Sequence, residues 1–166
     1  MKHLATLSLT AIALAACQSA PPRPASTRTP SFYLSMAKAD AVVDAAMARD
    51  MISAYRRNKG LGPLTLDPGL LAEAEAEAAA MAAADRPTSA DAFKARLAAA
   101  GFKAPAANLS AGYHTVAEAF SGWRESAQHN RVLLDPQAKR VGIATAYNPR
   151  SKYKVYWALV VAADDR

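Results

Sequence analysis

The 166-residue chain contains a single cysteine, Cys17. One cysteine excludes any disulfide within the chain, so a folded domain must be stabilised by a packed apolar core. The composition allows such a core, because 52% of the residues are hydrophobic and alanine is abundant. The length is that of one ordinary domain with some additional residues. The sequence therefore predicts one globular domain without disulfides.

The segment before Cys17 has the pattern of an export signal. Lys2 and His3 form a short polar start, and residues 4–16 are apolar apart from three hydroxyl side chains. This run is too short to cross a bilayer comfortably, but it has the length of a signal-peptide core. Residues 14–17, Leu-Ala-Ala-Cys, resemble the lipobox of bacterial lipoproteins, whose cysteine thiol receives a diacylglyceryl group. A plain secretory signal with an incidental cysteine is the alternative.

Residues 18–31 contain four prolines and several serines and threonines, without apolar periodicity. Such a composition is typical of an extended linker. We therefore expect a lipoprotein signal peptide at residues 1–16, a lipid-anchored flexible tether at residues 17–31 and a folded domain at residues 32–166.

The first half of the domain has two helical patterns. Apolar residues recur near a 3.6-residue period between Phe32 and Asn58. Asp67 followed by Pro68 is a strong helix start, and the helix is expected to reach about residue 84. Glu73 and Glu77 share one face of it, which is expected to be solvated.

Three shorter helices are expected next. One runs over residues 90–100 and ends at Gly101. The second begins at Thr115, where Thr115 and Glu118 form a capping box. The third begins at Ser126 and is closed by residues 135–136, Asp-Pro.

The end of the chain is rich in β-forming residues. Residues 141–147 and 153–163 predict an antiparallel hairpin with a five-residue loop. The second strand has few polar residues, so both of its faces are expected to be covered. Residues 104–112 are either irregular or a short strand. Helices followed by a hairpin indicate an α+β or three-layer arrangement.

Eight short fragments follow one another in a recognisable order and spacing: residues 53–56, 60–64, 66–70, 96–102, 108–112, 123–129, 141–144 and 156–157. Together they cover about residues 41–162 and resemble the CAP superfamily, also called the SCP/PR-1 or cysteine-rich secretory domain. The resemblance implies an α+β fold, a three-layer α-β-α sandwich with a C-terminal antiparallel β-hairpin.

The resemblance also implies a cleft. In the family this cleft carries two histidines and two acidic residues, and it binds a divalent cation in some members. His129 falls at the second histidine position, but residues 85–89, near the first, contain no histidine. Ala107 stands at one acidic position, and Glu125 is the residue that fits the other. The site is therefore eroded, and we expect no bound metal.

The candidate ligand cleft consists of His129, Glu125, Asn108 and Trp123. His129 is suited to hydrogen-bond a ligand or to transfer a proton, and a half-buried histidine bonded to a backbone carbonyl is an equally good interpretation. Trp123 fits a ligand platform, while its helical spacing with Phe120 favours core packing.

Other chemistries lack support in the sequence. There is no P-loop, dinucleotide-binding fingerprint or His-x-x-x-His pair, and Ser121 and Ser126 lack the context of a nucleophilic serine. We therefore expect no cofactor, and an enzyme is less expected than a binding protein. The net charge is +6, but the basic residues are scattered, so no nucleic-acid partner is expected.

The expected function is that of a membrane-tethered extracytoplasmic module that binds a lipid, a peptide or a cell-wall fragment. A hydrolase using His129 with Glu125 and a structural envelope protein are the alternatives. The expected partner is the membrane, through the lipid on Cys17. Gln18, in place of an aspartate after the cysteine, favours the outer membrane.

The lipid anchor is directly testable. Cys17→Ser removes the acceptor thiol, so the variant should leave the membrane fraction or accumulate as unprocessed precursor. Fractionation and the mass of the N-terminal peptide measure both outcomes. A variant that is processed and fractionates like the wild type would rule out the anchor.

Overall fold

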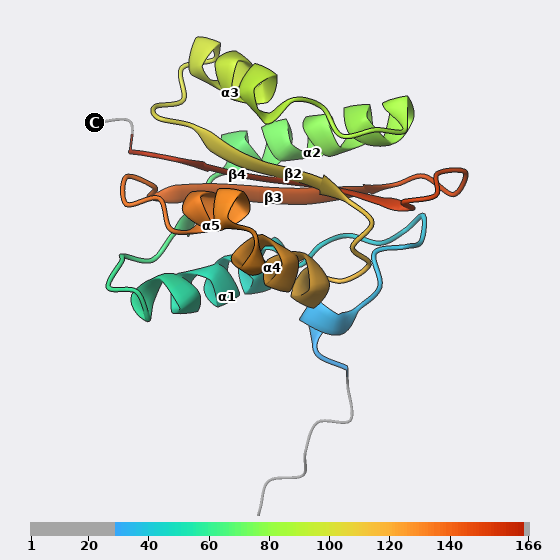
Figure 1. Ribbon diagram of the computed structural model, residues 1–166, viewed down its shortest axis with the longest axis horizontal. Coiled ribbons are helices and arrows are strands. Elements are labelled where there is room, and N and C mark those ends of the chain that lie inside the picture. The colour runs from blue at the N-terminus through green and yellow to red at the C-terminus, as the bar shows by residue number, and fades with distance from the viewer. Residues whose placement is uncertain (1–28, 165–166) are drawn as a thin grey trace, which may run out of the picture.

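The computed structural model describes residues 29–164 (Figure 1). Cys17, the signal peptide and most of the predicted tether lie outside the described residues. The elements in chain order are η1 (Ser31–Tyr33), α1 (Ala45–Arg57), β1 (Thr65–Leu66), α2 (Pro68–Ala84), α3 (Ala90–Ala99), β2 (Ala106–Ala111), α4 (Val116–Glu125), α5 (Ala127–Leu133), β3 (Arg140–Tyr147) and β4 (Val155–Ala162). None of the helices in this part of the chain has the length and apolar character needed to span a membrane.

The four strands form one sheet in the order β1-β3-β4-β2. β3 and β4 are the predicted antiparallel hairpin, with Tyr147 opposite Val155. β2 adds to β4 in antiparallel orientation, and the short β1 lies parallel to β3. All eight residues of β4 are buried, which confirms that both faces of this strand are covered. β4 begins at Val155, two residues later than predicted, because Lys154 adopts a left-handed backbone conformation (φ 62°).

Helices cover both faces of the sheet (Figure 1). α2 and α3 pack on one face, and α1, α4 and α5 pack on the other. Successive residues of β4 alternate between the two apolar cores, with Trp157 in the core of the α1 layer and Tyr156 in that of the α2 layer. The predicted three-layer α-β-α sandwich is confirmed.

Side-chain caps set the helix starts much as the sequence predicts. The side chains of Asp67, Thr115 and Ser126 accept hydrogen bonds from amides in the first turns of α2, α4 and α5. Glu118 departs from the expected capping box, because its carboxylate accepts from the amide of His114, one residue before the cap.

The first helix begins later than its apolar period suggested. α1 starts after Asp44, whose carboxylate accepts a hydrogen bond from the Met47 amide at 3.0 Å. The preceding segment consists of the short helix η1 and irregular chain with a turn at residues 38–41. Its Met36 amide donates to the His114 carbonyl at 2.7 Å. Met36 and Val43 are buried there. The apolar residues between η1 and position 44 therefore pack as irregular chain, and the predicted α-helix from Phe32 is wrong.

Glu77 corrects a second prediction. Its side chain is 2% exposed, where a solvated face was expected. α3 folds across this side of α2, so that Thr88 and Arg96 contact the Glu77 carboxylate. A charge that is buried needs such partners. Glu77 therefore joins α2 to α3.

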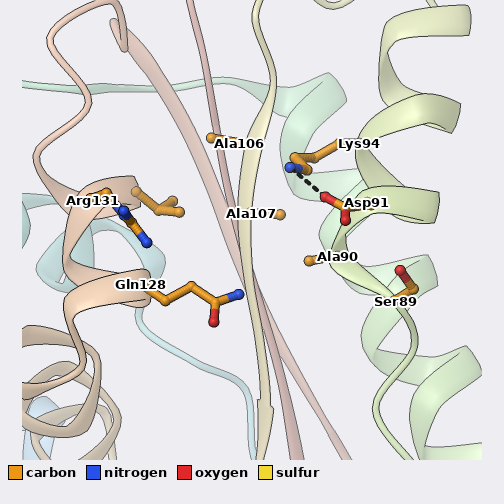
Figure 2. Close-up of a pocket in the computed structure, with 9 residues that line it drawn as sticks. Ser89, Ala90, Asp91, Lys94, Ala106, Ala107, Gln128 and Arg131 are labelled. Carbon is orange, nitrogen blue, oxygen red and sulfur yellow. Dashed lines mark ion pairs between the residues drawn. The ribbon is translucent and has the colours of Figure 1, made fainter.

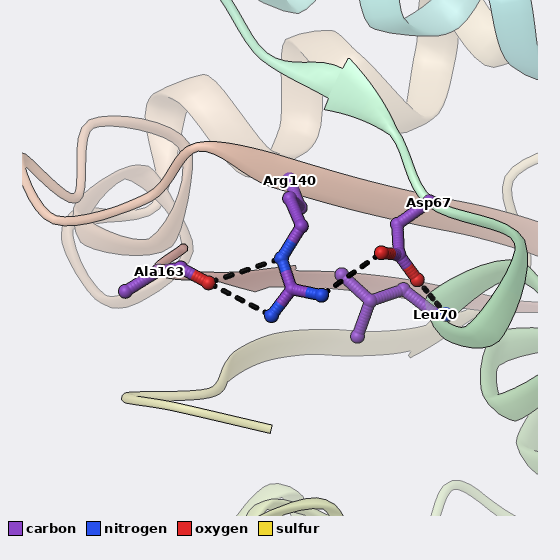
Figure 3. Close-up of polar contacts among 4 residues, drawn as sticks. All are labelled: Asp67, Leu70, Arg140 and Ala163. Carbon is purple, nitrogen blue, oxygen red and sulfur yellow. Dashed lines mark hydrogen bonds and ion pairs between the residues drawn. The ribbon is translucent and has the colours of Figure 1, made fainter. Parts of the chain in front are cut away.

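The start of α2 is also bound to the sheet (Figure 3). The Asp67 carboxylate accepts from the Leu70 amide at 2.8 Å and from the Arg140 guanidinium at 2.9 Å. Arg140 donates in addition to the Ala163 carbonyl, beyond the end of β4. Burial raises the pKa of Asp67, but the hydrogen bonds from Leu70 and Arg140 outweigh it and hold the pKa below its usual value.

Gly142 allows α2 to lie directly on β3. A Cβ atom at this position would be 2.3 Å from the carbonyl carbon and oxygen of Leu70. This distance is far below van der Waals contact, so only glycine fits. The backbone of α2 therefore touches the backbone of β3 at Gly142.

Arg56, at the end of α1, is completely buried. Its guanidinium donates to four backbone carbonyls, those of Gly62, Leu133, Asp135 and Ala138, at 2.9–3.1 Å. These carbonyls belong to the loop before β1, the end of α5 and the loop before β3. One side chain thus joins the end of α1 and the loop that follows it to residues 133–138, more than 70 positions later in the sequence.

Replacing Arg56 should destabilise the domain. Arg56→Met keeps much of the volume but leaves buried carbonyls without donors, which should lower the free energy of unfolding by about 3–5 kcal/mol. Urea unfolding followed by tryptophan fluorescence measures this loss. The neighbouring Arg57 is exposed, so Arg57→Met is the matched control and should have little effect. A loss below about 1 kcal/mol for Arg56→Met would contradict the assignment.

Candidate functional site

Two of the predicted site residues, Asn108 and His129, come together between β2 and α5. The even-numbered residues of β2 face the layer formed by α1, α4 and α5, so Asn108 projects towards α5. Its side-chain amide donates to the backbone carbonyl of His129 at 3.0 Å. Ser126, the N-cap of α5, accepts from the His129 amide at 3.5 Å. At the start of α5, both backbone groups of His129, its carbonyl and its amide, are thus bound by side chains.

Two polar atoms at this junction are buried without a hydrogen-bond partner among residues 29–164. They are the Asn108 side-chain oxygen and His129 Nδ1. Asn108 is completely buried, and burial also lowers the pKa of His129. A buried acceptor without a partner costs free energy, so a small polar group that satisfied either atom would stabilise this junction.

Glu125 does not join this pair. It is the last residue of α4 and is exposed. Within the described residues, no hydrogen bond or ion pair connects Glu125 to His129. The two residues required for the alternative of a hydrolase are therefore present, but their side chains are not hydrogen-bonded to each other.

Trp123 lies in the core. Its ring is 1% exposed and packs edge-on against Trp157, with 6.0 Å between the ring centroids. The indole Nε1 donates to the Ser110 hydroxyl at 3.1 Å. No face of the ring is available to a ligand, so the expectation that Trp123 lines the cleft is corrected in favour of core packing.

A cleft of about 430 Å³ lies beside the Asn108–His129 pair, between α3 and α5 (Figure 2). Its floor is the edge strand β2, represented by Ala106 and Ala107. Gln128 and Arg131 project from α5, on one side, and Asp91 and Lys94 stand on α3, on the other. The lining residues are Ser89, Ala90, Asp91, Lys94, Ala106, Ala107, Gln128, Arg131 and Val132.

Sequence reasoning found only the border of this cleft. Asn108 and His129 are the immediate neighbours of Ala107 and Gln128, which line it. No sequence signal marks Gln128 or Arg131, because both read as the solvated side of a short helix. Asp91 and Lys94 are three residues apart and form an ion pair at 2.7 Å, which reads as ordinary surface charge.

The cleft does not fit the metal that the family binds in some members. Ala107 replaces one acidic ligand and has no donor atom. Asp85, at the start of the loop expected to carry the first histidine, accepts a hydrogen bond from the Tyr156 hydroxyl at 2.5 Å. Hydrogen bonds from Ser151 and Tyr156 lower the pKa of Asp85. In the described residues, no three His, Cys, Asp or Glu side chains are grouped closely enough to hold a metal ion.

Solved structures share this architecture. An extracellular protein containing an SCP domain from Bacillus anthracis has 20% sequence identity and a TM-score of 0.60 over 72% of this chain and 40% of that protein. A cysteine-rich secretory protein from Staphylococcus aureus has 20% identity and a TM-score of 0.59, covering 72% and 38%. The matched region spans less than half of each of these proteins. The fold is therefore of the SCP class.

A smaller protein matches over most of its length. An outer surface protein from Borrelia burgdorferi has 14% identity and a TM-score of 0.61, and the match covers 71% of this chain and 90% of that protein. At the sequence level, comparison with curated proteins finds no match. The model of the CAP family, described as the cysteine-rich secretory protein family, matches residues 49–161. The chain belongs to the CAP family.

The burial of His129 predicts a pH dependence of stability. Because the folded state disfavours the imidazolium, the unfolded state binds more protons once the pH falls below about 6.5, the ordinary pKa of histidine. The free energy of unfolding should therefore decrease between pH 7 and pH 5. The carboxyl groups with lowered pKa act at lower pH, because their unfolded pKa is 3.8.

Urea unfolding at pH 5, 6 and 7 measures this dependence. His129→Gln should flatten it, whereas His114→Gln, at an exposed position, should retain it. An unchanged slope in His129→Gln would show that His129 is not the responsible group.

Proposed function

We propose that the chain is a membrane-tethered extracytoplasmic CAP-domain lipoprotein that acts as a non-enzymatic binding module. The ligand would be a small lipid, a peptide or a cell-wall fragment. The observation that carries the proposal is the cleft on β2, which has a volume of about 430 Å³, within the usual range of about 300–1,000 Å³ for a ligand pocket. Near it, Ala107 stands at one of the family's acidic positions, and residues 85–89 contain no histidine.

The envelope location draws on two kinds of support. The sequence around Cys17 resembles a lipobox, and the structural relatives include an extracellular protein and an outer surface protein. A lipid on Cys17 would hold the domain close to the membrane, on the periplasmic or the outer face. The scattered positive charge is compatible with an anionic membrane surface.

A retained ligand is the direct test. The protein is extracted from its own membranes and analysed by native mass spectrometry, and we expect a mass above that of the lipidated chain, released on denaturation. Gln128→Trp fills the cleft from its exposed wall and should abolish the extra mass. Ala127→Trp is the matched control, because Ala127 is exposed on the same helix and does not line the cleft.

Two other outcomes favour the alternatives. An extra mass unaffected by Gln128→Trp, or none at all, would argue for a structural envelope protein. Titration with zinc, magnesium and calcium at neutral pH should detect no site tighter than about 1 μM. A one-to-one site of that affinity, abolished by His129→Ala, would favour the hydrolase instead.

A further inference from the structure

The floor of the cleft is a free strand edge. β2 is the last strand of the sheet and pairs on one side only, with β4. The Gly112 amide donates to the Val155 carbonyl at 3.0 Å, one step beyond the register in which Ala111 faces Tyr156. Backbone groups of an antiparallel strand alternate in direction. The even-numbered residues of β2 therefore turn their backbone groups to β4, and Ala107 turns its N–H and C=O to the open side.

Ala106 and Ala107 both line the cleft, although Ala107 as a whole is only 6% exposed. Ala106 and Ala107 contribute only methyl groups to the floor. The walls, α3 and α5, stand on the two sides of β2 and do not cross it at this point (Figure 2). An open strand edge binds another strand through main-chain hydrogen bonds. An occupant of this edge would lie between the two walls, which suits a single extended chain better than a second sheet.

The charge of the cleft indicates which end of an extended peptide would lie in it. Asp91 and Lys94 neutralise each other across 2.7 Å. Arg131, on the opposite wall, is exposed and has no ion-pair partner among residues 29–164. A guanidinium binds a carboxylate through two parallel hydrogen bonds. The cleft thus presents an amide-pairing edge next to one uncompensated positive charge.

We propose that the cleft binds the C-terminal end of an extended peptide, which pairs with the Ala107 edge of β2 as an added strand and places its terminal carboxylate on Arg131. This inference rests on the proposed function of a ligand-binding cleft and names its ligand class. Small side chains suit the ligand, because it must lie between Gln128 and Lys94.

The probe is acetyl-Ala-Ala-Ala with a free carboxylate, titrated into the full ¹⁵N-labelled chain in detergent. We expect saturable shifts of the Ala107 amide and the Arg131 side chain, with slower hydrogen exchange at Ala107. The C-terminally amidated peptide should bind about ten-fold more weakly. Arg131→Gln should weaken binding of the free peptide by the same factor, because it removes the same carboxylate–guanidinium contact. The affinity for the amidated peptide, which lacks the carboxylate, should stay unchanged.

Two variants complete the test. Ala107→Pro removes the outward N–H while keeping the bonds to β4, as proline is tolerated on an open edge, and should abolish binding. Arg124→Gln, an exposed arginine on α4, should leave the affinity unchanged. If Ala107→Pro fails to fold, the comparison of the free and amidated peptides on the wild-type protein still tests the proposal.

Three outcomes would overturn the inference. Equal affinities for the free and amidated peptides would show that Arg131 does not bind the terminal carboxylate. Displacement of the peptide by inorganic phosphate without any change at the Ala107 amide would make the cleft an anion site without strand pairing. The third outcome combines two results: the peptide does not bind, and the purified protein retains another molecule that Gln128→Trp abolishes. It would reject a peptide ligand while leaving the proposed function intact.

Discussion

The guanidinium of Arg56 is the interaction on which the rest of the structure depends. It donates to the ends of three segments, so the exit of α1, the end of α5 and the approach to β3 are fixed relative to one another. Burial lowers the pKa of Arg56, and the nearby Asp135 opposes this shift, but a guanidinium remains charged. The Leu133 carbonyl is the last of α5 and has no partner within the helix, and the Arg56 guanidinium donates a hydrogen bond to it. The position of α5, and with it one wall of the cleft, follows from this contact.

The opposite side of the molecule is held by polar contacts of another kind. Tyr156, completely buried in β4, donates to Asp85 and lies 2.8 Å from the Ser151 hydroxyl. Burial and the contact with Asp85 raise the pKa of Tyr156. The Asn148 side chain donates to the Ala82 carbonyl at 2.8 Å. These bonds tie the β3–β4 loop to the end of α2, in the region where the family's first histidine is expected, so that Asp85 has a structural role there.

Local chemistry made most of the fold predictable from the sequence. Asp67, Thr115 and Ser126 mark helix starts because each cap is satisfied within a few residues, and the apolar run in β4 indicates a strand with two covered faces. Glu77 and the residues before Asp44 were misread because their environment comes from other elements, α3 and the loop at His114. The site shows the same limit. Asn108 and His129 stood out by residue type and resemblance, but Arg131 becomes informative only when α5 is seen beside the edge of β2.

The contact at Gly142 has a mechanical consequence. On the α2 face, backbone lies against backbone, and such a contact has no rotamers through which it can adjust. On the other face, the spacing is set by side chains such as Trp123 and Trp157, which meet edge to face. The distance between α2 and β3 is therefore set by backbone atoms, whereas the distance between α4 and the sheet is set by side-chain packing. A side chain larger than hydrogen at position 142 would therefore have to move the backbone of α2 away from β3.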